Sequence, residues 1–158
     1  MTLSQIIETA VNPALALLPA VMNTPPARCM LLAIGLQESR FVHRRQIGGP
    51  ARGFWQFEKG GGVRGVLTHA STREQAQLVS KARGVPATAD AVYDALDKDD
   101  VLAAAFARLL LWSDPKALPA LGDADASWAL YLRTWRPGKP HPETWSDLYR
   151  QAVAEVVP

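Results

Sequence analysis

The stretch ARCMLLAIGLQESR, residues 27–40, is apolar at nearly every position until it ends in a glutamate, a serine and an arginine. A helix that is apolar on all sides belongs at the centre of a fold, because none of its faces is suited to water. The preceding turn, Asn23-Thr24-Pro25-Pro26, offers Thr24 as an N-cap and prolines for the first helical turn. The sequence therefore predicts a central buried helix over residues 27–40 that ends in polar side chains.

Six further stretches have the apolar spacing of helices. They are residues 3–18 (interrupted by Pro13), 71–82 (with a capping box at Ser71 or Thr72), 88–96, 99–112, 124–134 and 143–157. Residues 46–65 are rich in glycine and predict a loop or a small β-hairpin, with residues 53–57 as a short strand or an ordered loop. The predicted fold class is mainly α, a single domain of six or seven helices over residues 1–158 in which residues 1–22 form an N-terminal helical extension.

The composition excludes several classes of protein. The apolar share is 48% and the charged share 20%, as in folded globular domains. No apolar run approaches the roughly 20 residues that cross a bilayer, so no membrane insertion is expected. The N-terminus carries Glu8 and no basic leader, so no signal peptide is expected. The single cysteine, Cys29, has apolar neighbours and is expected to be buried rather than to act as a nucleophile.

Charge is unevenly distributed along the chain. Residues 28–73 hold eight Lys or Arg residues against two acids, Glu38 and Glu58. Such an excess would favour an anionic partner, either nucleic acid or a carboxylate-bearing polymer such as bacterial cell wall. A solvated basic face is the simpler alternative. The three histidines lack the spacing of metal ligands, so no metal site is expected.

Glu38 is the candidate for a general acid. A carboxylic acid works in this role near neutral pH only if burial raises its pKa by about one or two units. The C-terminal end of a buried helix provides this in two ways, because the apolar neighbours and the negative end of the helix both disfavour the charged form. The alternative is a surface glutamate that happens to end the helix, or one paired with Arg40 or Arg44.

A second motif, ARGFWQFE at residues 51–58, follows closely. It combines the aromatic pair Phe54 and Trp55 with the amide of Gln56. Carbohydrate sites use this mixture, because an aromatic face packs against the apolar side of a sugar ring and an amide both donates and accepts hydrogen bonds. Alternatively, Trp55 and Phe57 are core residues of a short strand.

The two motifs together resemble those of the lysozyme-like lytic transglycosylases, which cleave peptidoglycan. In that family a catalytic E-S ends a buried helix, an A-x-G-L-M-Q segment follows, and an A-Y-N segment lies late in the domain. The matching residues here are Glu38-Ser39, then Ala51-x-Gly53-Phe54-Trp55-Gln56, and later Tyr131. The resemblance covers residues 27–138 and implies a lysozyme-like fold with its catalytic core in that stretch.

The resemblance also implies roles for individual residues. Glu38 would be catalytic, and the substrate-binding residues would be Ser39, Gly53, Phe54, Trp55, Gln56 and Tyr131. Trp135 adds an aromatic group that the family motif does not specify. Leu132 stands where the family has Asn, so one polar contact of the family's groove is missing or moved.

The implied reaction is cleavage of the MurNAc–GlcNAc β-1,4 bond in peptidoglycan glycan strands, without a cofactor. In the transglycosylase route one glutamate protonates the glycosidic oxygen and then removes the C6 hydroxyl proton, which gives a 1,6-anhydro sugar. Muramidase-type hydrolysis stays open as an alternative, because it needs a second carboxylate and Glu58 could provide it.

The missing leader and the small size suggest a phage or prophage member of the family. Such a protein would be virion-associated or cytoplasmic until released, would act in the periplasm or cell wall, and would have phage virion or tail proteins as further partners. Two other hypotheses stay open. One is a phage structural protein that keeps a lysozyme-like fold without activity, and the other is a nucleic-acid-binding module that uses residues 28–73. The enzyme hypothesis includes no nucleic-acid partner.

Overall fold

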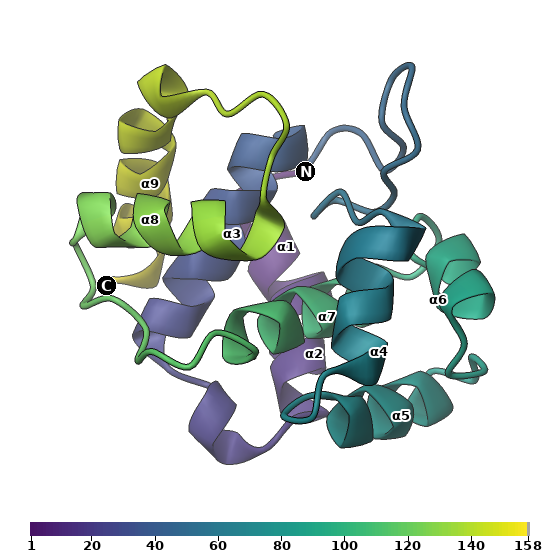
Figure 1. The fold of residues 1–158 in the computed structure, drawn as a ribbon. Coiled ribbons are helices and arrows are strands. Elements are labelled where there is room, and N and C mark those ends of the chain that lie inside the picture. Colours follow the sequence, from purple (N-terminus) through teal and green to yellow (C-terminus); the bar gives the residue numbers. More distant parts are fainter. Residues whose placement is uncertain (158) are drawn as a thin grey trace.

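A buried helix, α3 (Pro25–Ser39), runs through the centre of the structure, a computed structural model that describes residues 1–157 (Figure 1). The Thr24 hydroxyl caps it by accepting a hydrogen bond from the backbone N–H of Ala27 at 3.2 Å. The side chains of residues 29–36 are all buried. The central helix predicted from residues 27–40 is confirmed.

The second buried helix is α7 (Asp100–Trp112), which contacts α3. Asp99 caps it by accepting a hydrogen bond from the backbone N–H of Leu102 at 3.0 Å. Every residue from Val101 to Leu111 is buried, including Arg108. Such a helix is stable only in the middle of a domain, because it has no polar face.

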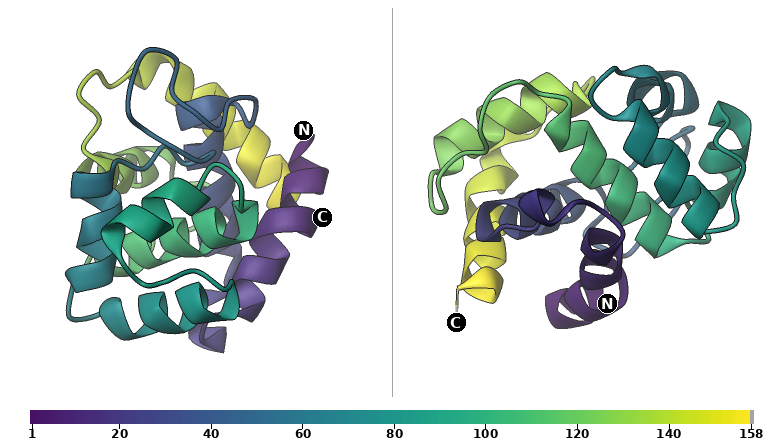
Figure 2. Two further views of the ribbon diagram at one scale, coloured as in Figure 1. Left: turned by 90° about the vertical axis from the view of Figure 1, so that its right-hand side faces the viewer. Right: turned by 90° about the horizontal axis from the view of Figure 1, so that it is seen from below.

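The N-terminal residues form one helical run beside α7 (Figure 2). It consists of α1 (Leu3–Ile6), the π-helical turn Ile7–Val11 and α2 (Asn12–Ala16). The sequence predicted an interruption at Pro13, which lacks an N–H. The wider π turn lies immediately before this proline, and the helix continues through it. The apolar face of the run is buried, so the N-terminal extension covers part of the core.

Four other helices lie close to the predicted ranges: α5 (Arg73–Ala82), α6 (Ala89–Ala95), α8 (Ala124–Trp135) and α9 (Pro142–Val156). Helix α9 packs along α3, and α8 packs on α9 (Figure 1). The capping box predicted at Ser71 or Thr72 is wrong, because the Thr72 hydroxyl donates to the backbone oxygen of Val66 instead. The mainly α fold class is confirmed.

The glycine-rich region differs from its prediction. Lys59–Val63 forms a π-helical turn that continues into α4 (Arg64–Thr68), so the glycines at 60–62 and 65 lie inside a helix rather than in a loop. Residues 44–57 form turns with two isolated bridges, and no strand is assigned within residues 1–157. Glycine has low helix propensity, but the buried Val63 and Val66 anchor this helix, so tertiary packing outweighs local preference.

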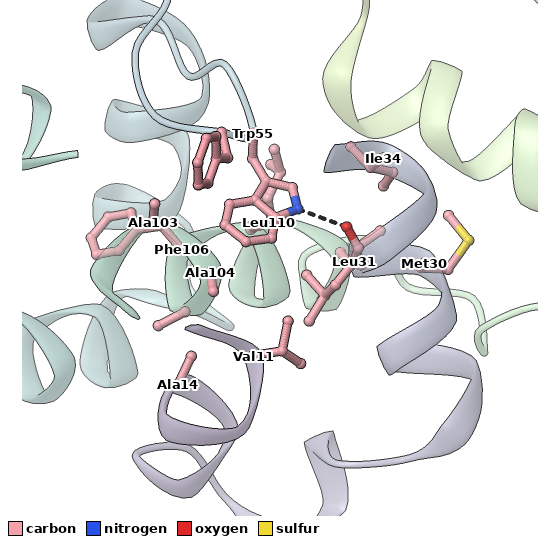
Figure 3. Close-up of a cluster of buried hydrophobic side chains, with 14 of the residues drawn as sticks. Val11, Ala14, Met30, Leu31, Ile34, Trp55, Ala103, Ala104, Phe106 and Leu110 are labelled. Carbon is pink, nitrogen blue, oxygen red and sulfur yellow. Dashed lines mark hydrogen bonds between the residues drawn. The ribbon is translucent and has the colours of Figure 1, made fainter. Parts of the chain in front are cut away.

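Trp55 lies in the centre of the core, in contact with the two buried helices (Figure 3). Its indole N–H donates to the backbone oxygen of Leu31 in α3 at 2.8 Å. Phe106 and Ala103 of α7 belong to the same buried cluster.

Within residues 1–157, none of the helices combines the length and the apolarity needed to span a membrane.

Gly53 is a position where the backbone requires glycine. Its φ is +78°, and an added Cβ would lie 3.0 Å from the backbone oxygen of Leu96. We therefore expect Gly53→Ala to lower the free energy of unfolding by roughly 2 kcal/mol, measured by urea denaturation. The matched control is Gly65→Ala in α4, where an added Cβ meets no atom within 4 Å. This variant should be as stable as the wild type or more stable, and equal losses at both positions would contradict the argument.

Candidate functional site

Glu38 lies in the last turn of α3, on the wall of an open cavity of about 530 Å³. Its side chain is half-buried rather than solvated. The cavity is lined by Gln37, Glu38, Gln46, Pro50, Ala51, Gln56, Glu58, Tyr131, Trp135, Arg136, Pro137, Gly138, Lys139 and His141. Side chains from the end of α3, the 46–58 segment and the end of α8 therefore meet around one carboxyl group.

Tyr131 holds the Glu38 carboxyl in place. Its hydroxyl donates to Oε1 of Glu38 at 2.8 Å, across 93 positions of sequence. The Tyr131 ring is buried and stacks on Trp145 of α9, with the ring centroids 5.4 Å apart and the planes at 11°. Because the ring is fixed by stacking, the donor reaches the carboxyl in a defined direction.

Burial raises the pKa of Glu38 from its ordinary value of 4.5 to about 7. The hydrogen bond from Tyr131 acts in the opposite direction, because it stabilises the carboxylate, but its effect is smaller than that of burial. The pKa of Tyr131 is itself raised, first by burial and then by the charge of Glu38, so the phenol stays a donor. Near pH 7 the Glu38 carboxyl therefore exists in both forms, and it can donate or accept a proton.

Ser39 lies beside Glu38 but points into the protein. Its hydroxyl donates to the backbone oxygen of Phe54 at 2.7 Å and accepts from the backbone N–H of Phe41 at 3.2 Å. It is buried and does not line the cavity. Ser39 therefore joins the end of α3 to the segment that carries Gln56, and its expected contact with substrate is not available in this structure.

Phe54 and Trp55 also lie away from the cavity. Each ring is 1% exposed, and both make edge-to-face contacts with Phe41. Their assignment as substrate-binding residues is corrected, because both side chains belong to the hydrophobic core. Gly53 is buried as well and contributes a backbone turn rather than a contact in the cavity.

Gln56 and Trp135 do reach the cavity wall. The Gln56 amide nitrogen donates to the backbone oxygen of Gly53 at 2.8 Å, which orients the side chain within its turn. The indole N–H of Trp135 donates to the backbone oxygen of Trp55 at 2.8 Å, and its ring is half-buried. Of the expected groove residues, the structure therefore brings Gln56, Tyr131 and Trp135 together with Glu38.

A larger cavity of about 850 Å³ adjoins the first. The two cavities share Glu58, Trp135 and Arg136, so they form one cleft with two lobes. Glu58 is exposed where the lobes meet. The helical run of residues 59–68, called the glycine-rich helix below, and α8 form walls of the larger lobe. Leu132 of α8 also lines this lobe. Adjoining cavities of about 530 and 850 Å³ offer room for more than a single small ring.

Four of the eight basic residues in 28–73 pair with aspartates of residues 90–100. The pairs are Arg44 with Asp100, Arg45 with Asp97, Arg52 with Asp94 and Lys59 with Asp90. The excess of positive charge predicted for this segment is therefore largely cancelled by a neighbouring helix and loop. Arg44 is bound to Asp100, so the alternative in which it pairs with Glu38 does not occur.

The other side chains with possible chemical roles are Cys29 and the potential metal ligands. Cys29 is buried, and burial raises the pKa of its thiol to about 11, which confirms a structural cysteine. Among the residues that the structure describes, no group of three or more His, Cys, Asp or Glu side chains could hold a metal ion.

The sequence indicates a loop after residue 135, but it did not predict that this loop lies beside Glu38. Gln37 donates to the backbone oxygen of His141 at 3.1 Å and accepts from the Thr144 hydroxyl at 3.0 Å. These bonds hold the loop 136–141 beside the Glu38 cavity, where Arg136 and Lys139 are exposed on the wall. Only the conformation of the chain brings this loop to α3, and no local motif predicts it.

Burial of Glu38 should make stability depend on pH. Because its folded-state pKa lies above the ordinary value, the folded protein binds more protons between pH 4.5 and about 7, and stability falls as pH rises through this range. We expect Glu38→Gln to be more stable than wild type at pH 8 by roughly 2–3 kcal/mol, with little difference at pH 4. Urea denaturation at several pH values measures this. Glu58→Gln, at an exposed position in the same cleft, is the control, and a Glu38→Gln profile that falls like the wild type would contradict the burial argument.

Comparison of the chain with models of protein families, with curated proteins and with solved structures found no match. The chemistry assigned to this cleft therefore rests on the residues and distances described above.

Proposed function

We propose that the protein is a peptidoglycan-cleaving glycosidase that cuts the MurNAc–GlcNAc β-1,4 bond with Glu38 as general acid and base. One observation carries the proposal: the Glu38 carboxyl, with a pKa near 7, is held by Tyr131 on the wall of an open cleft with two lobes. The motif resemblance to lytic transglycosylases is consistent with this chemistry. The resemblance and the position of the carboxyl in the cleft both point to Glu38.

The proposed reaction uses Glu38 twice. The protonated carboxyl gives its proton to the glycosidic oxygen as the bond to the anomeric carbon breaks. The resulting carboxylate then takes the proton of the C6 hydroxyl, whose oxygen closes on the anomeric carbon to form a 1,6-anhydro ring. A pKa near neutrality suits a group that must both lose and regain a proton within one cycle. Tyr131 would stabilise the carboxylate formed between the two steps.

Trp135 and Gln56 are the proposed substrate-binding side chains. The half-buried Trp135 ring lies between the two lobes, where it could pack against the apolar face of a sugar. Gln56 could bind hydroxyl or acetamido groups near Glu38. Arg136 and Lys139, exposed beside them, could meet the carboxylates of peptidoglycan stem peptides.

Transglycosylation is preferred to hydrolysis because Glu38 is the only carboxyl of its own lobe that is not exposed, and the mostly buried side chain of Asp114 in the larger lobe is already paired with Arg133. A two-carboxylate hydrolase also needs a second acid at a suitable distance, and the exposed Glu58 is the candidate on this cleft.

The enzyme would meet its substrate in the periplasm or cell wall, after delivery in a virion or release from the cytoplasm, with phage virion or tail proteins as partners. Binding to nucleic acid is less well supported, because four cations of residues 28–73 are already paired with aspartates.

Zymography on purified cell wall tests the proposal. We expect clearing by the wild type and a loss of about 10²- to 10⁴-fold in rate for Glu38→Gln, since a general acid contributes that much. Glu58→Gln should clear normally if the reaction is transglycosylation. Mass spectrometry of the products separates the routes, because anhydro ends are lighter than reducing ends by one water. Absence of clearing by a folded wild type would favour a structural protein without activity, a hypothesis for which the apolar Leu132 in the cleft is the main support.

The pH dependence of the rate gives an independent test. The first step needs protonated Glu38, so kcat/KM should fall on the alkaline side with an apparent pKa near 7. Tyr131→Phe removes the hydrogen bond that lowers the Glu38 pKa, so the alkaline limb should move to higher pH. A limb that stays in place or moves to lower pH in this variant would show that Tyr131 does not set the acidity of Glu38.

A further inference from the structure

Arg108 is a buried cation that the proposed chemistry does not use. It lies on α7 among apolar side chains and is 2% exposed. Its Nε–H donates to the backbone oxygen of Met22 at 2.8 Å, and its guanidinium carbon lies 5.5 Å from the centre of the Trp112 ring. Its Nη1 is buried without any hydrogen-bond partner among the residues that the structure describes. Arg108 therefore has donor capacity that the protein itself leaves unused.

Among the described residues 1–157, no carboxylate forms a salt bridge or hydrogen bond with Arg108. Asp114 lines the same cavity as Arg108, but it accepts two hydrogen bonds from Arg133, at 3.2 and 3.1 Å. Burial alone lowers the pKa of Arg108 to about 10, and no acidic group acts in the opposite direction. The guanidinium is thus charged at neutral pH. A buried charge without a counter-ion is strongly unfavourable, so a site of this kind favours an anion.

Arg108 lines a cavity of about 280 Å³ that does not include Glu38, although Asp114 and Pro115 line both this cavity and the larger lobe of the cleft. The cavity is lined by Arg108, Leu111, Trp112, Asp114, Pro115, Lys116, Ala117 and Leu118. Lys116 is exposed on this wall and adds a second positive charge, while most of the other lining residues are apolar. The cavity therefore offers a cationic group at a buried position and an apolar surround.

We propose that this cavity is a binding site for a small carboxylate with a short apolar chain. The carboxylate would accept hydrogen bonds from the Arg108 guanidinium, which is the geometry that guanidinium groups favour. A monoanion matches the one buried cation, because Lys116 is exposed to solvent and Asp114 also lines the cavity, so the second charge of a dianion such as sulfate would have no buried counter-charge. The aliphatic part of the ligand would pack against Leu111, Trp112 and Leu118. The ligand is either a free acid or the carboxyl end of a peptide.

Thermal unfolding with added anions tests this site on the whole protein. Sodium butyrate at constant ionic strength is expected to raise the Tm of the wild type in a saturable way, whereas chloride and sulfate are not. Arg108→Met should abolish the butyrate effect and, because it removes an uncompensated buried charge, should have a higher Tm than wild type without ligand. Arg73→Met, at an exposed position on α5, is the control and should keep the butyrate effect.

Three results would overturn the proposal: no saturable shift with butyrate, an equal saturable shift in Arg108→Met, or an equal saturable shift with sulfate. If Arg108→Met fails to fold, Leu118→Trp, which fills the cavity from its wall, provides the second variant and should also abolish the shift. A tripeptide with a free carboxyl end, compared with its C-terminal amide, separates the two sources of ligand. A shift with butyrate alone identifies a free acid, and a larger shift with the free-ended peptide identifies a chain end. Cell-wall clearing is not part of this readout, so the result is independent of the proposed glycosidase activity.

Discussion

The burial of one carboxyl group at the end of α3 is the constraint on which the candidate site depends. Helix α3 must lie in the core because it is apolar on all sides, and its last turn therefore carries Glu38 to the boundary between core and cleft. Burial raises the pKa of Glu38 to about 7, and Tyr131 keeps the group oriented while moderating that shift. The same arrangement that suits proton transfer makes the folded state less stable at neutral pH, which is common at sites built for chemistry.

Ser39 and the sharp bend after it link this carboxyl to the rest of the cleft. Arg40 and Phe41 both have positive φ, so the chain reverses at once and the Phe41 ring folds back over Gly35, where an added Cβ would lie 2.1 Å from the ring. The Ser39 hydroxyl then bonds the Phe54 carbonyl. The rings of residues 54 and 55 are thus buried in the core, and Gln56, the residue that follows them, lines the cleft.

The sequence predicted the helical parts of the fold well, because long apolar stretches such as α3 and α7 have no stable alternative to burial as helices. It also predicted a raised pKa for Glu38 from its position alone. It failed where the role of a residue depends on distant contacts. Trp55 has the composition of a sugar-binding residue, but its indole N–H is already bonded to Leu31. The aspartates that pair with this basic segment lie 31 to 56 positions away in sequence, and local charge counts cannot pair them.

The glycine-rich helix shows how the open volume of the cleft is maintained. An added Cβ at Gly60 or Gly65 would meet no protein atom, so packing does not require glycine at these positions. Each glycine disfavours the helix by about 1 kcal/mol relative to alanine. Both residues line the larger lobe of the cleft, where any side chain would occupy space that is now open. The glycines therefore make this helix less stable than alanines would. They also leave the cleft wider than residues with side chains would. An extended ligand with bulky substituents needs that width, whereas a small ligand bound only near Glu38 would not.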